Sequence, residues 1–357
     1  MKLVVYGLTV TSSWGNGHAT TYRSLFKAMA RRGHQIHFVE RDVEWYRSNR
    51  DMPQPPFCTV HLYDDWGDSA ATLLDLSKDA DAVVVGSYFP DAIAATRSLL
   101  QLTRAPLLFY DIDTPITMAH LRSSGATAYL EAALIPQYSA YLSFTGGPAL
   151  RELEQRFGAQ RAIAFYCSVD PEIYHPTAAR PEFCCDLSYL GTYAADRQPK
   201  LMYLLNDAAA AAPAQKFIVA GPQYPPDISW SANVGRIIHL SPPEHPFFYS
   251  SSRFTLNLTR DDMVAAGSSP SVRLFEASAC GAAILSDSWP GLEDFLTPGQ
   301  EILLPRNTRE VLEILRDLGD DERTRMGAHA RERILSEHTS AHRAEQFETI
   351  VAACSRR

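Results

Sequence analysis

Phosphate chemistry is the first function suggested by the residue types between positions 267 and 281. Three serines and a proline follow an alternating apolar run at residues 254–258. Serine caps helices and proline fits the first helical turn, so the stretch predicts a helix that begins at Ser269 and ends at Gly281. The first N–H groups of such a helix, around Ser268 and Ser271, have no partner within it. They can therefore hold a phosphate beyond the preceding strand.

Arg273 and Glu276 are three residues apart in this predicted helix, so their side chains lie on one face. One interpretation is a surface ion pair on an ordinary strand–helix–strand unit. The other is a ligand site in which Arg273 joins the phosphate-binding backbone. The stretch alone leaves both open.

Arg197 and Lys200 form a second basic pair, at the start of a helix predicted after the strand and glycine turn at residues 186–191. A pyrophosphate carries two to three negative charges and needs nearby cations as it leaves. The alternative is a solvated helix start. Basic side chains in a first turn oppose the helix dipole, which favours the functional interpretation.

A glycine-containing loop follows the first apolar run and precedes an amphipathic helix. Gly15 and Gly17, on either side of Asn16, let the backbone approach a ligand closely, although the loop is not the dinucleotide fingerprint G-x-G-x-x-G. His18 comes next, and it either simply opens the helix or takes part in catalysis.

Two carboxylates, Asp111 and Asp113, follow a buried apolar run at residues 107–110. An Asp-x-Asp pair can hold a divalent cation. We favour another arrangement, in which one carboxylate contacts an acceptor or acts as a base and the other caps the turn. We therefore expect no metal site.

Strands that alternate with helices must position these residues. Such alternation predicts parallel sheets wound on both faces, which bind ligands beyond the carboxyl ends of their strands. The predicted strands are 3–6, 36–39, 82–86, 107–110, 141–144, 186–190, 217–221, 234–240, 254–258, 283–285 and 302–304. The predicted helices beyond the first include 91–100, 150–157, 269–281, 308–318, 321–335 and 338–353. Prolines at 171, 176 and 181 mark a linker between the two halves.

The stretch at 273–287, Arg-Leu-Phe-Glu-Ala-Ser-Ala-Cys-Gly-Ala-Ala-Ile-Leu-Ser-Asp, resembles the nucleotide-sugar motif of glycosyltransferases with the GT-B fold. It is most similar to the spore-maturation CgeB-type group. The resemblance covers nearly the whole chain, most specifically at 15–23, 107–116, 186–200 and 267–287. It implies an α/β GT-B architecture, with two Rossmann-like, doubly wound parallel-sheet domains facing a central cleft. The acceptor-side domain would span 1–170 and the donor domain 177–335, with a C-terminal helix at 338–354 crossing back onto the first.

The resemblance also implies roles for single residues, with Glu276 holding the ribose hydroxyls of the donor. The donor-binding set would be Gly191, Arg197, Lys200, Gly221, His239, Ser268, Ser269, Ser271, Arg273 and Glu276. The catalytic candidates are Asp113, Asp111 and His18, and the acceptor-side loop is Gly15, Asn16 and Gly17. Many retaining relatives carry a glutamate where this chain has Ser268, which leaves the stereochemistry of transfer open.

The function that follows is a hexosyltransferase-type glycosyltransferase. It would move a sugar from a nucleotide-diphosphate donor to a small-molecule, glycan or protein acceptor. Two alternatives remain: a nucleotide-sugar 2-epimerase on the same fold, which needs no acceptor, and a non-catalytic nucleotide-sugar binding protein. The motif names neither the sugar, the base nor the acceptor.

Composition agrees with a globular chain of about two domains, since 46% of its 357 residues are hydrophobic and 21% charged. A formal net charge of −8 argues against nucleic-acid binding and against a basic membrane surface. The six cysteines lack metal-type spacing, as expected for reduced thiols. The N-terminal apolar run is too short for a signal peptide, and no stretch is long enough to span a bilayer. We expect a soluble cytoplasmic protein without a metal cofactor.

Overall fold

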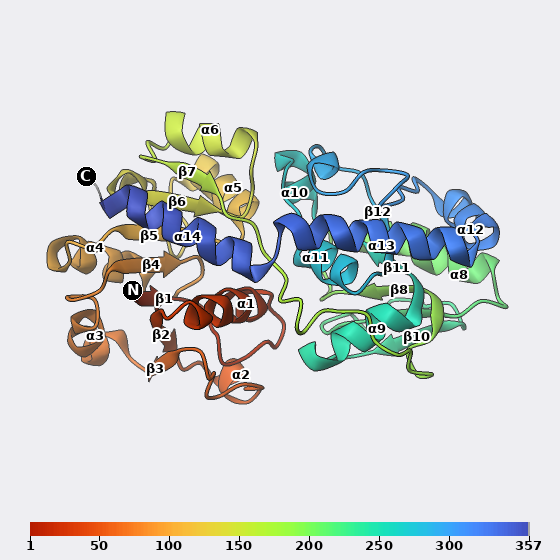
Figure 1. The fold of residues 1–357 in the computed structure, drawn as a ribbon, viewed down its shortest axis with the longest axis horizontal. Coiled ribbons are helices and arrows are strands. Elements are labelled where there is room, and N and C mark those ends of the chain that lie inside the picture. Colours follow the sequence, from red (N-terminus) through yellow and green to blue (C-terminus); the bar gives the residue numbers. More distant parts are fainter. Residues whose placement is uncertain (356–357) are drawn as a thin grey trace. The chain divides into compact units, whose positions relative to one another are not determined.

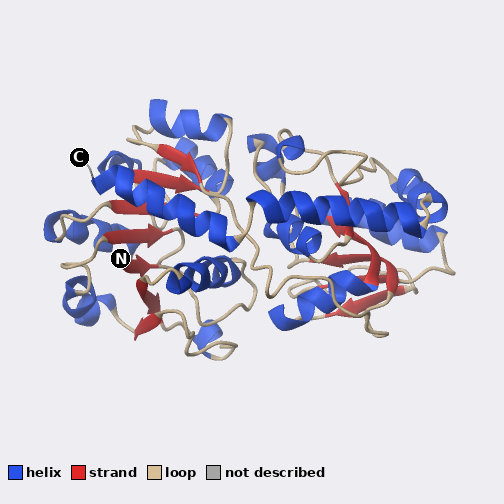
Figure 2. Ribbon diagram, viewed as in Figure 1, coloured by secondary structure: helices blue, strands red, loops and turns tan. Residues whose placement is uncertain are grey.

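The computed structural model describes residues 1–355 and divides them into two compact units (Figure 1). The first unit contains Met1–Ser168 and the segment from Ser340 onward, and the second contains Val169–Thr339. Figure 2 shows a sheet surrounded by helices in each unit. The chain therefore enters the second unit once and returns to the first through its last helix.

The sheet of the first unit has seven parallel strands in the order β3-β2-β1-β4-β5-β6-β7. Their bounds are β1 (Lys2–Tyr6), β2 (Gln35–Arg41), β3 (Thr59–Tyr63), β4 (Ala82–Gly86), β5 (Leu107–Asp111), β6 (Ala140–Ser143) and β7 (Ala162–Ala164). β4 and β5 are buried along their whole length, which explains their continuous apolar runs.

Two strands of this sheet were not predicted. β3 and β7 are the edge strands, and each has only one neighbour. β3 is only partly buried and β7 is three residues long, so neither needs a strongly apolar sequence.

The helices of the first unit connect and cover these strands. They are α1 (His18–Arg31), α2 (Glu44–Arg47), α3 (Trp66–Asp75), α4 (Ala92–Leu102), α5 (Thr114–Ser124), the 3-10 helix η1 (Ala132–Gln137), α6 (Pro148–Gln155) and α14 (Ser340–Ser355). α14 packs against α1. Its Glu348 accepts hydrogen bonds from Arg32 at 2.7 Å, and its Gln346 donates to the carbonyl of Ala164 at 2.8 Å.

The second unit has a five-stranded parallel sheet in the order β10-β9-β8-β11-β12. The strands are β8 (Cys185–Leu190), β9 (Phe217–Ala220), β10 (Val234–Ile237), β11 (Ser252–Asn257) and β12 (Ala283–Ser286). The predicted strand at 302–304 is wrong, because Leu303 makes only an isolated bridge to Leu285.

Short helices and turns join these strands. They are α7 (Gln198–Leu201), the π-helical turn η2 (Met202–Asn206), α8 (Asp207–Ala211), η3 (Pro242–Glu244), α9 (His245–Ser251), α10 (Asp261–Ala266), α11 (Val272–Ala279), η4 (Leu292–Asp294), α12 (Thr308–Asp317) and α13 (Asp320–Glu337). No helix within residues 1–355 is long and apolar enough to cross a membrane.

The helix that carries Arg273 and Glu276 begins later than predicted. α11 starts at Val272, and Ser271 before it is extended, with φ −79° and ψ 151°. The residue before a proline is disfavoured in the helical region, which keeps Ser269 out of a helix. The predicted end is confirmed. Gly281, with φ 71°, donates to the carbonyl of Ser278, and Ala282 donates to that of Ala277, which forms a Schellman motif.

Candidate functional site

Arg273 lies where the strand order of the second sheet reverses, between β8 and β11. Its Nε donates to the carbonyl of Leu190 at the end of β8, and its Nη1 donates to Oδ1 of Asn257 at the end of β11, at 3.0 Å. The guanidinium also lies 4.8 Å from the ring centroid of Tyr189. Open α/β sheets bind ligands at this reversal, so the buried cation is fixed at the expected binding position of the fold.

Two glycines keep the same strand ends close together. A Cβ on Gly191 would lie 2.6 Å from Nη2 of Arg273, and one on Gly221 would lie 2.1 Å from the carbonyl oxygen of Gly191. Gly221 also has a φ of +139°, which side chains rarely adopt. Gly221 is therefore required by its packing against the backbone of Gly191, whereas a Cβ on Gly191 would meet only the ends of the Arg273 and Tyr189 side chains.

Glu276 is buried, and this overturns the surface-pair interpretation. Arg273, 7% exposed, directs its hydrogen bonds to Leu190 and Asn257, and Glu276 is 5% exposed. Burial raises the pKa of Glu276 to about 7, against the opposing effects of Tyr174, of the Arg273 charge and of Tyr249. A carboxyl group with this pKa changes charge near neutral pH.

His245 is the neighbour of Glu276 that sequence reasoning missed. Its Nδ1 lies 3.9 Å from Oε2 of Glu276. Burial lowers the pKa of His245 to about 4, so the ring is neutral at pH 7. Its Nε2 lies 3.3 Å from the carbonyl oxygen of Leu240, and its Nδ1 lies 3.2 Å from the hydroxyl oxygen of Tyr174. Asn257 is another site residue that sequence reasoning missed. Unlike His245, it had a signal in the sequence, because it is a polar residue at the end of a predicted strand.

The two predicted diphosphate cations have different environments. Arg197, at the N-cap of α7, donates from Nη2 to the carbonyl of Thr192 at 2.7 Å, and its buried Nε has no hydrogen-bond partner within residues 1–355. Lys200 is fully engaged. Its Nζ lies 3.0 Å from Asp261, 3.1 Å from Asp287 and 3.1 Å from the carbonyl of Thr259. Lys200 therefore joins the ends of two strands to α10.

One of the amide groups predicted to be free in the serine stretch, that of Ser268, is already bonded. Ser268 has a φ of 43°, and its N–H donates to the carbonyl of Pro290 at 2.7 Å. Ser269 is fully buried. The hydroxyl of Ser271 donates to Oδ1 of Asn257 at 2.7 Å, next to Arg273. His239 is exposed beyond the end of β10.

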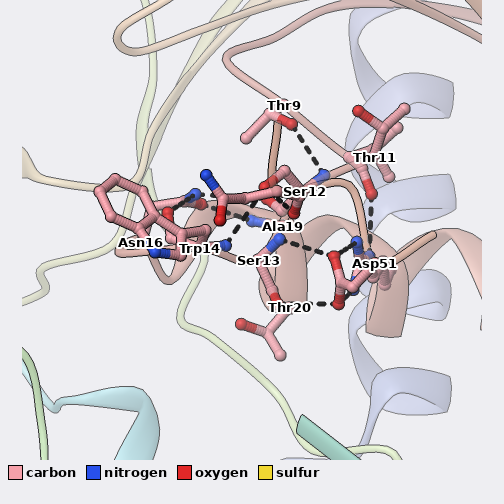
Figure 3. Close-up of polar contacts among 12 residues, drawn as sticks. Thr9, Thr11, Ser12, Ser13, Trp14, Asn16, Ala19, Thr20 and Asp51 are labelled. Atoms are coloured by element: carbon pink, nitrogen blue, oxygen red, sulfur yellow. Dashed lines mark hydrogen bonds and ion pairs between the residues drawn. The ribbon is translucent and has the colours of Figure 1, made fainter. Parts of the chain in front are cut away.

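In the first unit the loop before α1 is held by its own side chains (Figure 3). Asn16 accepts from the backbone N–H of Ala19 at 3.1 Å and donates to the carbonyls of Ser12 and Trp14. Gly15 has a φ of 67°, and Gly17 is the N-cap residue of α1. Asn16 thus caps the first turn of the helix.

A buried carboxylate that the sequence did not reveal anchors the start of this loop. Glu40, fully buried on β2, accepts hydrogen bonds from the hydroxyls of Thr9 and Thr11 and from the N–H groups of Val10 and Thr11. The loop position therefore depends on a residue in the next strand along the chain.

His18 and Asp113 are brought together, whereas Asp111 is separated from them. Nε2 of His18 lies 3.5 Å from Oδ2 of Asp113, whose side chain is 38% exposed. Nδ1 of His18 is buried without a hydrogen-bond partner in the described chain, and its ring meets Tyr88 edge-on at 5.5 Å.

Asp111 is fully buried and accepts from Tyr141 and, at 2.9 Å, from Thr117. Burial raises the pKa of Asp111 to about 6. It holds β5 to β6 and α5, so of the two carboxylates only Asp113 has surface with which to contact a ligand.

Residues 197–349 match a protein family described as glycosyl transferase-like. No curated protein matches the sequence. Among solved structures, the sucrose-phosphate synthase of Thermosynechococcus elongatus is similar at 14% identity and a TM-score of 0.70, over 99% of this chain and 98% of that one. Anabaena HepE in complex with UDP-glucose is similar at 12% and 0.70, over 99% and 100%. An alpha-glucosyltransferase in complex with UDP is similar at 13% and 0.72, over 98% and 99%.

These findings confirm the predicted GT-B fold, which the solved structures share over 98% or more of this chain. The family match over residues 197–349 supports the predicted glycosyltransferase class. The prediction of no nucleic-acid partner gains no support, because one similar structure is an alpha-glucosyltransferase with UDP-glucose and DNA containing an abasic site.

Proposed function

We propose that the nucleoside diphosphate of the donor binds in the second unit, beyond the ends of β8 and β11. The observation that carries this proposal is Arg273, a buried guanidinium bonded to Leu190 and Asn257 at the reversal of strand order. Solved structures of similar fold hold UDP or UDP-glucose, which makes UDP the first nucleotide to test. We also propose that the protein belongs to the CgeB-type group and that it is cytoplasmic.

Glu276 is the candidate contact for the ribose. Its carboxylate would accept hydrogen bonds from the two ribose hydroxyls, and such bonds stabilise the charged form of a carboxyl group. Because burial holds its pKa near 7, the ligand hydroxyls would replace part of the solvation that Glu276 lost on folding.

Arg197 is the stronger candidate for the departing diphosphate, since its Nε is buried without a partner while Lys200 has three oxygen partners. Charge grows on the leaving group as the glycosidic bond breaks, so a fixed cation there stabilises the transition state more than the ground state. Lys200 would act by holding Asp287 and α10 in position.

The acceptor hydroxyl would be activated in the first unit by Asp113, whose carboxylate is partly exposed, with His18 positioning it from the buried side. The 3.5 Å separation of Nε2 of His18 and Oδ2 of Asp113 supports this pairing. The base would take the proton from the acceptor hydroxyl, whose oxygen attacks the anomeric carbon while the nucleoside diphosphate departs.

The test is calorimetric titration of the whole chain with UDP, with and without chelator, followed by transfer assays. We expect saturable binding that the chelator leaves unchanged, because Arg197 and Arg273 supply the positive charge. Arg197→Ala should lower kcat by roughly 10²–10³. His18→Ala should lower transfer while the affinity for UDP stays at the wild-type value.

Three outcomes contradict the proposal. UDP binding that disappears with chelator would show that the diphosphate site needs a metal. Wild-type kcat in Arg197→Ala would remove Arg197 from the site. Conversion of the donor without an acceptor, and without release of nucleoside diphosphate, would indicate an epimerase.

A further inference from the structure

His37 and His61 form a pair of imidazoles that the proposed function does not use. His37 lies on β2 and His61 on β3, and the register pairs Val39 with His61. Residues 37 and 39 of a strand point to the same face, so the two histidines are diagonal neighbours on one side of the sheet. Nδ1 of His37 lies 3.0 Å from Nε2 of His61, and the rings are stacked at 27°.

Both side chains of the pair are only partly buried. Neutral imidazole is the form that binds metal ions, and histidine is the commonest metal ligand in proteins.

Lys2, on the neighbouring strand β1, is a cation near the pair, and it forms an ion pair with Asp79. The carboxylate offsets part of the positive charge that a metal ion held by the rings would meet.

We propose that His37 and His61 bind one divalent transition-metal ion, through Nδ1 of His37 and Nε2 of His61. At a Zn–N distance of about 2.0–2.1 Å, their 3.0 Å separation corresponds to an N–Zn–N angle of about 94°. Opening the pair by about 0.3–0.4 Å gives the tetrahedral angle at the same bond lengths. Water molecules complete the coordination, because residues 1–355 contain no group of three or more histidine, cysteine or acidic side chains that could hold a metal ion.

Binding replaces the hydrogen bond between the rings. The proton shared by the two nitrogens moves to the outer nitrogen of its own ring, through solvent, so no net proton is released from the neutral pair. Zn²⁺, Ni²⁺ and Cu²⁺ are the candidate ions because imidazole suits all three, and affinity should rise towards Cu²⁺.

The experiment uses the whole chain without an affinity tag, stripped with chelator and titrated with Zn²⁺ and Ni²⁺ in a non-coordinating buffer. We expect one saturable site. His37→Gln and His61→Gln should each weaken binding by roughly tenfold or more, since even changes around metal ligands cost about 10–100-fold. His120→Gln, at an exposed histidine on α5, is the matched control and should leave the affinity unchanged.

A second readout identifies the ligands directly. Paramagnetic Cu²⁺ or Ni²⁺ should broaden the NMR signals of two imidazole rings selectively. One of these signals should be absent from the spectrum of His37→Gln and the other from that of His61→Gln. Unchanged metal binding in the His37→Gln/His61→Gln double variant would overturn the proposal, as would the lack of any saturable site at millimolar metal. Transfer activity should be the same in the double variant and the wild type, which separates this site from the proposed glycosyl-transfer site.

Discussion

At the scale of single residues, Glu276 links the proposed donor site to pH. Its pKa is raised from 4.5 to about 7, so the folded protein binds more protons than the unfolded chain between these values. The contribution of Glu276 to the free energy of unfolding is therefore fully present below about pH 4.5 and is lost as the pH rises to about 7.

Glu276→Gln removes this pH dependence, because the amide cannot ionise. We expect the variant to gain stability relative to the wild type as the pH rises from 5 to 7, by roughly 2 kcal/mol. Urea unfolding at each pH measures the difference. A constant difference across this range would contradict the raised pKa, and UDP titration of the same variant would show separately whether the carboxylate contacts ribose.

Lys200 shows how a predicted ligand residue also holds the structure. Asp287, with a side chain 9% exposed, pairs with Lys200 and accepts from the N–H and hydroxyl of Thr259. Breaking a buried pair by removing one partner typically destabilises by about 3–5 kcal/mol. We expect Lys200→Ala to lower stability by roughly 3 kcal/mol, because Asp287 would keep its charge without a cation.

Denaturant unfolding measures this loss, and Lys200→Ala/Asp287→Asn is its control. The double variant should recover part of the stability, because the uncompensated charge is gone. If Lys200→Ala unfolds like the wild type while kcat falls, Lys200 acts on the substrate and not on Asp287.

At the scale of elements, the approach of β8 and β9 at their carboxyl ends depends on Gly221. A Cβ there would lie 2.1 Å from the carbonyl oxygen of Gly191, and the φ of +139° is strained for any other residue. Overpacking and backbone strain each cost about 1–3 kcal/mol, so we expect Gly221→Ala to lose roughly 3–5 kcal/mol.

Gly235→Ala on β10 is the matched change, because the nearest atom to its Cβ would be 3.7 Å away. It should unfold within about 1 kcal/mol of the wild type. Equal effects of the two substitutions on urea unfolding would show that the strand ends tolerate a side chain at Gly221.

The helices and strands that could be predicted from the sequence are those that a short stretch of residues determines. β1, β4 and β5 have other strands on both sides and read as apolar runs, and Gly281 ends α11 as its left-handed backbone requires. The start of α11 was misplaced because Pro270 keeps Ser269 out of the helical region and Ser271 is extended, so the helix begins only at Val272.

The residues of the candidate site also divide into those with a local sequence signal and those that depend on distant contacts. Arg273 and Glu276 belong to a recognisable motif, whereas His245, Asn257 and Glu40 act through neighbours that only the fold brings to them. Glu276 lies 31 residues from His245 along the chain, Arg273 lies 16 from Asn257, and Thr9 lies 31 from Glu40. Local spacing therefore could not show these contacts, although Asn257 stood out as a polar residue at a strand end.

At the scale of the whole molecule, the first unit depends on the last helix of the chain. α14 buries Ala344, Phe347, Ile350 and Val351 in that unit. Each such side chain larger than alanine contributes about 1.5–3 kcal/mol when buried, and domains are stable by only about 5–15 kcal/mol in total. We expect a chain that ends at Thr339 to lose the first unit as a folded body.

Hydrogen exchange measures this loss strand by strand. Protection should disappear from β1, β4 and β5 and persist in β8 and β11. Glu348→Gln, which removes only the partly exposed pairs with Arg32 and His34, should keep protection in both units. Retained protection of β1 in the shortened chain would show that α14 is dispensable.

The place of α14 has a consequence for the order in which the protein is made. Synthesis runs from the N-terminus, so the seven strands of the first unit leave the ribosome long before the helix that completes their packing. The second unit, contained within Val169–Thr339, has all its residues earlier than the first unit does. The unit whose strands are translated first is therefore the unit whose packing is completed last. Until α14 is made, the surface of α1 that packs against it has no partner.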